Sequence, residues 1–562
     1  MSERARLTPL PLVAGALVAA LALIPFGYVL AATIEMGWSQ FQELLFRPRV
    51  GELLTNTSML LLGTLTITIV LGVSAALAVV RTDLPFPLFW HALLCAPLAI
   101  PAFVNSYGWV SLTHAVQSYG GAVLVVSLSY YPLVYLPVVA MLSTLDAATE
   151  EVAWSLGHSR TRTLFTVVLP RIAPAVLGGA LLVALHVMAE FGALQLLAFQ
   201  TFTTAIYGQY RSAFASEGGT VLASVLVLGC VLLLSLELLI RGRRRLARVG
   251  RGAGRPAEPV RLGWRQVPLT VALVGLVGMT LGVPIYALAR WLVVGSSTEF
   301  VTGDVSQAFL STFSLAIAGA AVTTVLALAP AWLAVRQRGA VAIFLERCTY
   351  TANALPGIVV ALALVWVSIR WTPDLYQTLP VLLAAYAILF LPRAVVSVRS
   401  SLEHAPVLLD QVSRSLGQSS WSTFRRVTVP LVAPGLGAGA ALAFLAVSTE
   451  LTATLILAPT GTSTLATEFW TNSSAVKYGA AAPYALLLIL VSLPATYVLG
   501  RQVRPGGSGG SRSSRARSRG MSRKAEEEGG AKPPSIDDNA ADRRLVRAQQ
   551  SMGPPDPPRR SG

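Results

Sequence analysis

The sequence predicts an all-α polytopic membrane protein with about twelve transmembrane helices in two homologous six-helix halves. Three observations support this fold class. Of the 562 residues, 54% are hydrophobic and only 12% are charged, roughly half the charged share of a soluble domain. Long apolar segments recur along the chain, and a polar stretch between two of them is repeated 260 positions later. A repeat of this length indicates a duplicated domain rather than a solenoid.

Twelve apolar segments reach about 20 residues, the length that crosses the hydrocarbon core of a bilayer. Each must be a helix, because a lipid-exposed segment has to satisfy its own backbone hydrogen bonds. The predicted spans are residues 10–33, 57–80, 88–109, 121–142, 175–199, 219–240, 267–292, 311–335, 349–369, 379–398, 435–458 and 479–500.

The net charge of +16 is distributed unevenly along the chain. Arginines crowd alternate loops, including nine between residues 241 and 265, whereas the other loops hold few. This asymmetry is typical of the cytoplasmic loops of membrane proteins and argues against a nucleic-acid-binding surface. It predicts that both termini and both copies of the repeated loop lie in the cytoplasm, and that the basic segment 241–265 is solvated and contacts anionic lipid headgroups.

Composition also predicts the domain boundaries. Residues 1–240 form the first half, 241–265 a basic cytoplasmic linker, and 266–502 the second half. From residue 503 onward Gly, Ser, Arg and Pro dominate. Such a segment has too few apolar residues to bury a core. Residues 503–562 are therefore predicted to be a disordered cytoplasmic tail.

Two features inside the spans repeat between the halves. Glu190 and Glu450 stand 260 positions apart, and Pro101 and Pro356 interrupt the third and ninth spans. A carboxylate within a span is costly and points to function, and interrupted helices at matching places point to a translocation pathway. We therefore expect these four residues to line a pore. The alternatives are that the glutamates bond neighbouring helices and that the prolines serve packing.

The sequence carries no recognisable catalytic constellation. It lacks the G-x(4)-G-K-[ST] phosphate loop, so the chain is not expected to hydrolyse ATP or to bind a cofactor. Its three cysteines have no metal-ligand spacing. His186 lies one helical turn before Glu190, which more often means an interhelical hydrogen bond than a metal ligand. No metal site is assigned.

The repeated stretch resembles the EAA loop of ABC importer permeases, E-x-A-x(3)-G followed by I-x-L-P. The first copy keeps Glu151, Ala153, Gly157, Leu169 and Pro170. The second keeps Gly417 and Pro430, with Gln411 in place of the acid, Asp410 beside it and Ser413 in place of the alanine. The resemblance implies the type I ABC importer transmembrane fold. It also implies that both loops are coupling helices docking on an ATPase, with the second departing further from the motif.

Residues 10–500 as a whole resemble fused-permease ABC importers, most closely those of the iron(III) type. The resemblance implies an inner-membrane permease subunit, an extracytoplasmic substrate-binding protein and two copies of a separate ATPase that uses the ATP. Thiamine, phosphonate, sulfate and polyamine permeases are the alternatives within this class. An ion-coupled secondary transporter is the alternative from another class, because twelve spans and paired intramembrane carboxylates also fit it. A membrane-embedded enzyme is a third reading, weakened by the lack of catalytic residues.

Overall fold

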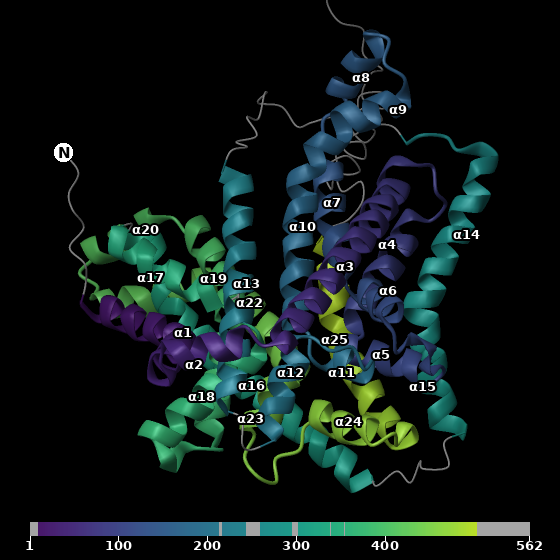
Figure 1. Cartoon of the computed structure of the whole chain (residues 1–562). Helices are drawn as coiled ribbons and strands as arrows, with labels where there is room; N and C mark the ends of the chain where they lie inside the picture. Colours follow the sequence, from purple (N-terminus) through teal and green to yellow (C-terminus); the bar gives the residue numbers. More distant parts are fainter. Residues whose placement is uncertain are drawn as a thin grey trace, which may run out of the picture. The chain divides into compact units, whose positions relative to one another are not determined.

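The computed structural model describes residues 9–212, 216–242, 259–294, 302–337, 339–352 and 355–502. All regular elements in these ranges are helices (Figure 1), and one isolated bridge pairs Thr82 with Val260. The predicted tail at 503–562 and most of the predicted linker at 241–265 lie outside the described residues.

The α-helices up to the linker are α1 Pro9–Met36, α2 Trp38–Leu45, α3 Pro48–Arg81, α4 Pro87–Cys95, α5 Ala102–Val110, α6 Tyr119–Tyr130, α7 Pro132–Thr144, α8 Ala148–Ser155, α9 Arg160–Thr163, α10 Leu169–Ala189, α11 Gly192–Leu196, α12 Phe202–Arg211 and α13 Ser216–Gly242. Those after it are α14 Gln266–Val277, α15 Val283–Val294, α16 Thr302–Trp332, α17 Ala340–Thr351, α18 Gly357–Trp371, α19 Leu379–His404, α20 Val407–Ser415, α21 Ser420–Thr423, α22 Val429–Ser448, α23 Thr452–Leu457, α24 Leu465–Ser474 and α25 Tyr478–Gln502. Short π turns include η3 Leu164–Val168, η5 Gly278–Gly282 and η9 Phe424–Thr428, and η1 Ala96–Ala99 is a 3₁₀ turn.

The order of helices repeats as the sequence predicts. The run from α3 to α13 has its counterpart in the run from α16 to α25. One difference is a kink of 40° that separates α6 from α7 at Pro132. Its counterpart, α19, continues through Pro392 as one helix. The duplication therefore extends from the sequence to the architecture.

The twelve predicted spans coincide largely with helices, but the spans predicted at 175–199 and 435–458 continue past the ends of α10 and α22, where the chain breaks before the short helices α11 and α23. Among the described residues, nine helices are long and apolar enough to cross a membrane, and two bent pairs raise the number to eleven. The remaining predicted span, the ninth at 349–369, falls on the end of α17 and the 15-residue α18. Prolines explain the interruptions: Pro101 stands at an 89° bend before α5, and Pro356 immediately precedes α18. A proline lacks an N–H and disfavours helical geometry in the residue before it.

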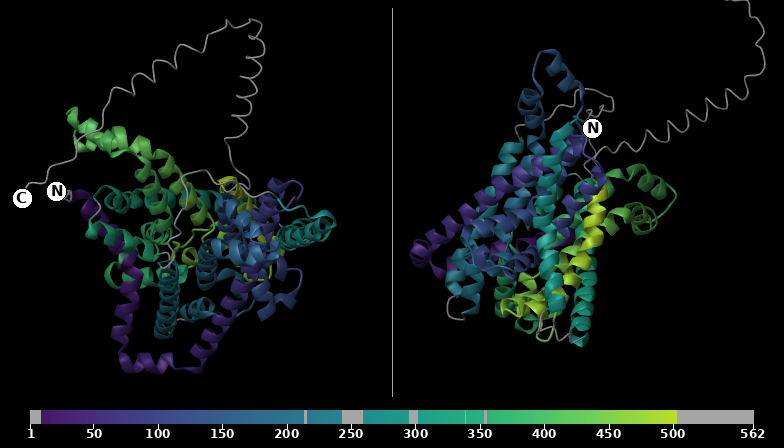
Figure 2. Two further views of the ribbon diagram at one scale, coloured as in Figure 1. Left: turned by 90° about the horizontal axis from the view of Figure 1, so that it is seen from above. Right: turned by 90° about the vertical axis from the view of Figure 1, so that its right-hand side faces the viewer.

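The two halves exchange their peripheral helices. α1 packs on α16, α17 and α18 of the second half, whereas α15 packs on α5 of the first half. Figure 1 shows α1 beside α17 and α18, with α14 and α15 at the opposite side next to α5. The view from above in Figure 2 shows the purple α1 and the teal α14–α15 at opposite edges of the bundle. Neither half is therefore packed independently of the other.

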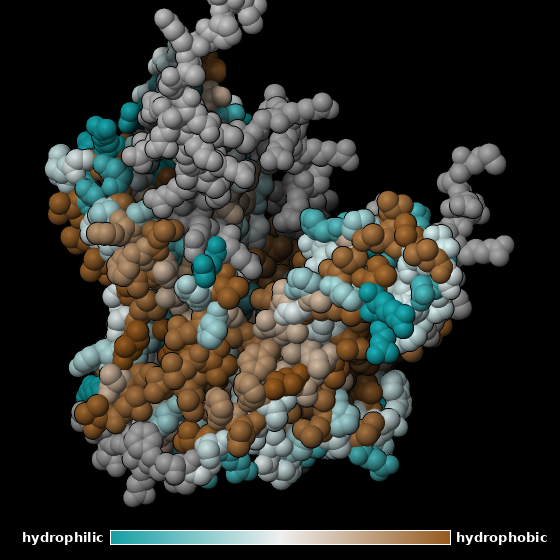
Figure 3. Space-filling model, turned by 180° about the vertical axis from the view of Figure 1, so that it is seen from behind, coloured by the Kyte–Doolittle hydropathy of each residue, from teal (hydrophilic) through white to brown (hydrophobic). Residues whose placement is uncertain are grey.

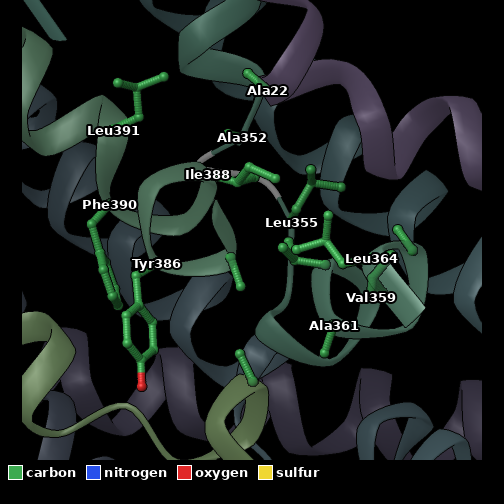
Figure 4. Close-up of a cluster of buried hydrophobic side chains, with 14 of the residues drawn as sticks. Ala22, Ala352, Leu355, Val359, Ala361, Leu364, Tyr386, Ile388, Phe390 and Leu391 are labelled. Atoms are coloured by element: carbon green, nitrogen blue, oxygen red, sulfur yellow. The ribbon is translucent and has the colours of Figure 1, made fainter. Parts of the chain in front are cut away.

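The largest buried cluster is centred on α18 and α19 and takes in Ala22 of α1 (Figure 4). Val359 and Ile388 in it are completely buried. The Tyr386 hydroxyl lies 2.8 Å from Thr454 Oγ1 of α23, so this polar group is satisfied inside the cluster. A second cluster joins α3, α4, α6, α7 and α10 of the first half with Leu273 of α14.

The outside of the bundle is rich in apolar side chains, as expected for a surface in contact with lipid. Broad brown areas cover the face in Figure 3, with hydrophilic residues along its lower edge. Leu62 of α3, Val271 of α14 and Leu310 of α16 are each about two-thirds exposed. A soluble protein rarely exposes apolar side chains on this scale.

Candidate functional site

The two repeated loops have the same backbone construction. Gly157 and Gly417 end α8 and α20 with φ of +83° and +80°. In the first loop His158 N donates to Ala153 O at 3.0 Å, and in the second Gln418 N donates to Ser413 O at 3.2 Å. This is the Schellman cap, whose left-handed residue is usually glycine because a Cβ strains it. The glycine of the sequence motif is thus explained by a turn.

A buried ion pair anchors each loop to the end of an earlier span, α3 for the first loop and the π turn η6 (Leu333–Gln337) that follows α16 for the second. Arg81 Nη2 lies 2.9 Å from Glu150 Oε1, and Arg336 Nη2 lies 3.4 Å from Asp410 Oδ2, with all four side chains at most 12% exposed. The structurally equivalent acids are therefore Glu150 and Asp410. The sequence motif pointed instead to the neighbouring pair, Glu151 and Gln411, which are exposed.

The other motif positions have equivalent places in the two loops. Ala153 is buried, and so is its counterpart Ser413, whose hydroxyl lies 2.9 Å from Thr423 Oγ1. The serine is thus accommodated by a hydrogen bond that alanine does not need. Leu169 and Pro170 begin α10 directly after the π turn η3, and Pro430 is the second residue of α22, which begins directly after η9. A π turn before each proline is a known response of a helix to a disturbed hydrogen-bond ladder.

Both loops expose apolar side chains outside the spans. Val152 and Leu156 are 57% and 74% exposed, and Val412 and Leu416 are 45% and 75% exposed. These residues are spaced by four positions, so each pair lies on one helix face. Exposed apolar patches of this kind mark surfaces that bind another protein or a membrane.

A cavity of about 340 Å³ lies between the halves. The ends of α10 and α22 line it with Glu190 and Glu450, and Pro101 lines it from the start of α5. Pro356 is not part of this lining. The structure therefore brings together three of the four residues that the sequence singled out inside the spans.

The two carboxylates make the same local bond. Glu190 Oε1 accepts from Ala193 N, and Glu450 Oε1 accepts from Ala453 N, each at 2.9 Å. Both glutamates therefore cap the N-terminus of the short helix that follows, where a negative charge is favourable. The sequence left open a pore-lining or a structural role, and the geometry combines a cavity-facing position with a capping bond.

The rest of the cavity differs between the halves. Tyr130 donates its hydroxyl hydrogen to Glu190 Oε2, whereas Phe390 occupies the corresponding place in the second half. Arg393 lines the cavity from α19, with its guanidinium 5.6 Å from the centre of the Phe390 ring. Sequence reasoning missed Tyr130 and Arg393. An arginine within the predicted span 379–398 was the available signal, because charged residues in spans are costly.

Aromatic contacts between the halves close the cavity on the side of α12 and α24. Phe103 meets Phe469 with ring centres 5.4 Å apart, and Phe191 meets Trp470 at 5.1 Å. Gly192 passes so close to Leu451 that an added Cβ would lie 2.9 Å from it. On the other side the lining continues from Glu450 back along α22 to Leu442, toward the repeated loops.

The polar groups of the cavity do not form a metal cluster. Among the residues that the structure describes, no group of three or more His, Cys, Asp or Glu side chains is arranged to hold a metal ion. His186 also lines the cavity, and its Nδ1 lies 2.8 Å from the Leu182 carbonyl one turn earlier.

Two duplicated helical halves, a cavity between them and two matched loops outside the spans define a membrane transport permease. The binding-protein-dependent transport system inner membrane component family matches residues 69–246 and 324–504, one match in each half. The chain belongs to this family. It is therefore an integral inner-membrane protein and a transport subunit.

Curated relatives agree with this assignment. The Fe(3+)-transport system permease protein FbpB 2 of Haemophilus influenzae is 40% identical over 473 residues, which are 84% of this chain and 93% of that protein. The sulfate transport system permease protein CysT of Escherichia coli K12 is 25% identical over 38% of this chain and 84% of its own length. The molybdenum transport system permease protein ModB of the same organism is 28% identical over 25% of this chain and 66% of its own length.

Proposed function

We propose that this chain is the permease of an ATP-driven importer of iron(III), coupled to a separate ATPase through its two repeated loops. The observation that carries the coupling role is the matched construction of these loops. Each is fixed by a buried ion pair to the end of an earlier span, α3 in the first half and α16 with its π turn η6 in the second, and each exposes apolar side chains at the end of a capped helix. An anchored loop with an exposed apolar surface is suited to transmit movement between a partner protein and the spans.

The pairing of the loops suggests a symmetric partner. Two loops with the same backbone construction fit a dimer of identical ATPase subunits, in which each subunit docks on one loop. Glu151 and Gln411 are exposed at equivalent places and differ in charge, so the two docking contacts are expected to differ in strength. On this proposal ATP is bound by the partner, and this chain binds no cofactor of its own.

The orientation follows from the same proposal. With the loops in the cytoplasm, both termini are cytoplasmic, and the aromatic contacts of Phe103, Phe191, Phe469 and Trp470 close the outer side. The cavity then extends from Glu450 toward the inside, which corresponds to an inward-facing state. An extracytoplasmic binding protein would deliver substrate to the α12 and α24 side.

The choice of iron(III) rests on the named relative with 40% identity and on the cavity's carboxylates. Carboxylate oxygens suit hard, highly charged cations. Arg393 offsets one of the two carboxylates, so the cavity is best suited to a ligated or partly hydrated cation. Sulfate, molybdate and phosphonate match the names of relatives at 25–28% identity, but two carboxylates disfavour an anion. Thiamine and polyamines are cationic, so the carboxylates do not disfavour them. The uptake experiment described next tests both as competitors.

The substrate test is uptake of labelled iron(III) by cells that depend on this permease, with unlabelled competitors. We expect excess iron(III) to abolish the signal and sulfate, molybdate, thiamine and spermidine to leave it unchanged. Accumulation of a labelled competitor in place of iron would overturn the substrate while leaving the permease assignment intact.

A further inference from the structure

A second cavity, of about 440 Å³, lies at the loop end of the first half, away from the central cavity. Its walls are the last turns of α3, the first repeated loop, and the segment 260–269 that leads into α14. We call it the α3–α14 pocket. It shares residues with the first repeated loop, including the Arg81–Glu150 ion pair, but none with the central cavity.

The segment that leads into α14 is held in place by specific bonds. Val260 N donates to Arg81 O at 2.8 Å, and Asp83 N donates to Val260 O at 3.2 Å. Asp83 Oδ1 also accepts from Leu262 N at 3.0 Å. The segment that leads into α14 is thus hydrogen-bonded to the end of α3. This wall of the pocket is therefore held in place by specific contacts.

The pocket's charged groups are mostly positive. Arg81, Arg160 and Arg265 line it together with one carboxylate, Glu150. Arg81 is 12% exposed and is paired with that carboxylate, but its buried Nε has no hydrogen-bond partner. Arg160 and Arg265 are exposed. The pocket therefore has two more guanidinium groups than carboxylates, an arrangement suited to binding a phosphate group.

The remaining lining is apolar, with Leu77, Leu164 and Leu269 among its members. On the adjoining outer surface of α14, Val267 and Val271 are 67% and 66% exposed, as lipid-facing residues are. Trp264, 78% exposed, stands directly before them, where tryptophan commonly marks the headgroup level of a bilayer. The pocket thus joins the lipid-facing surface of the bundle at the depth where headgroups lie.

The corresponding place in the second half is arranged differently. Arg336 donates from both Nη1 and Nη2 to the Ala405 carbonyl at 3.2 Å, in addition to its ion pair with Asp410. The position equivalent to Trp154 is occupied by Arg414. Both terminal nitrogens of Arg336 are therefore occupied there, although its Nε, like that of Arg81, has no hydrogen-bond partner.

We propose that the α3–α14 pocket binds one anionic phospholipid. Its phosphate lies between Arg160 and Arg265 and toward Arg81, and an acyl chain lies against Leu77 and Leu269. Basic pockets between membrane helices are suited to anionic headgroups in this way. Because Trp154 and Arg160 belong to the first repeated loop, the lipid contacts that loop directly. Placing it in the cytoplasmic leaflet rests on the proposed orientation, but the pocket's chemistry does not.

The test measures lipid binding to the purified full chain in a neutral detergent, without ATPase or substrate. Three probes are added in turn: phosphatidylglycerol, phosphatidylcholine with the same acyl chains, and inorganic phosphate. Binding is followed by native mass spectrometry and by the shift in thermal unfolding temperature. We expect saturable binding of one phosphatidylglycerol that weakens with salt, and no comparable response to the other two probes.

Matched variants locate the site. Arg160→Gln with Arg265→Gln is expected to weaken phosphatidylglycerol binding about tenfold or more. Arg261→Gln with Arg414→Gln removes the same charge from exposed positions outside the pocket and is expected to leave binding unchanged. Equal binding by both double variants, or an equal response to phosphatidylcholine, would overturn the site. A full response to inorganic phosphate alone would replace the lipid with a free anion. Because transport is not measured, failure here leaves the proposed function standing.

Discussion

Glu190 and Glu450, 260 positions apart, each accept a 2.9 Å hydrogen bond from the backbone N–H three residues further along. Both also line the cavity between the halves. One side chain in each half thus combines a capping bond with a carboxyl group that faces the cavity. Because each side chain has both roles, one substitution can change the carboxylate alone and another can remove the capping bond as well.

Glutamine at both positions is expected to abolish or strongly reduce uptake while leaving thermal stability near wild type. Its Oε1 can still accept the capping bond, so only the charge is lost. Alanine removes the cap as well and is expected to lower stability by about 1 kcal/mol per site. Uptake and unfolding temperature are measured on the same preparations. Normal uptake by Glu190→Gln with Glu450→Gln would remove the carboxylate charge from the mechanism.

Gly157→Asp is expected to impair co-purification of the ATPase and uptake, because it puts a carboxylate at the negative end of the α8 dipole and beside the docking face. The control is Gly157→Asn, since asparagine tolerates positive φ and has the same shape without the charge. Nothing lies within 4 Å of the added Cβ, so neither variant is expected to clash. We expect the same contrast, but a milder loss, for Gly417→Asp and Gly417→Asn. Equal behaviour of Asp and Asn variants in both loops would count against a charge-sensitive docking surface.

Arg81→Ala is expected to destabilise the protein strongly, on the order of 3–5 kcal/mol, because it leaves Glu150 buried without its partner. Arg47, whose 3.9 Å pair with Glu43 is largely exposed, serves as the comparison. Arg47→Ala is expected to cost at most about 1 kcal/mol. Thermal unfolding in detergent ranks the variants. A small effect of Arg81→Ala would mean that the buried pair does not hold the first loop in place.

Reporter fusions at Arg162 and Ser118 are expected to report opposite sides of the membrane, with Arg162 in the cytoplasm. Arg162 belongs to α9 of the first repeated loop, and Ser118 caps α6 at the other end of its span. An alkaline phosphatase signal at Arg162 would reverse the topology and exclude ATPase docking on this loop.

The sequence predicted the features that depend on composition and repetition. Apolar segment lengths located the helices, and the 260-residue repeat paired Glu190 with Glu450 and Gly157 with Gly417. It did not predict features that depend on packing between distant segments. The exchange of α1 and α15 between the halves is one of these. The choice of Glu150 over Glu151 as the buried acid is another, because only the position of Arg81 decides which of two adjacent carboxylates turns inward.

Arg393 is a charged residue within a predicted span, so the sequence did carry a sign of its importance. The 260-residue repeat pairs the two glutamates, whereas Arg393 has no charged counterpart, since Leu133 occupies the matching place. The structure puts it in the same cavity as both glutamates. Duplicated proteins can therefore place functional groups in one half only, and a repeat-based reading passes over them.

The most direct test of the central claim is transport by purified components in proteoliposomes. This chain is reconstituted with its ATPase and binding protein, and labelled iron(III) is supplied to the outer side. We predict accumulation of iron that requires ATP hydrolysis and the ATPase subunit and is unaffected by collapsing the proton gradient. Accumulation without the ATPase, driven by an imposed proton gradient, would contradict the account and identify a secondary transporter instead.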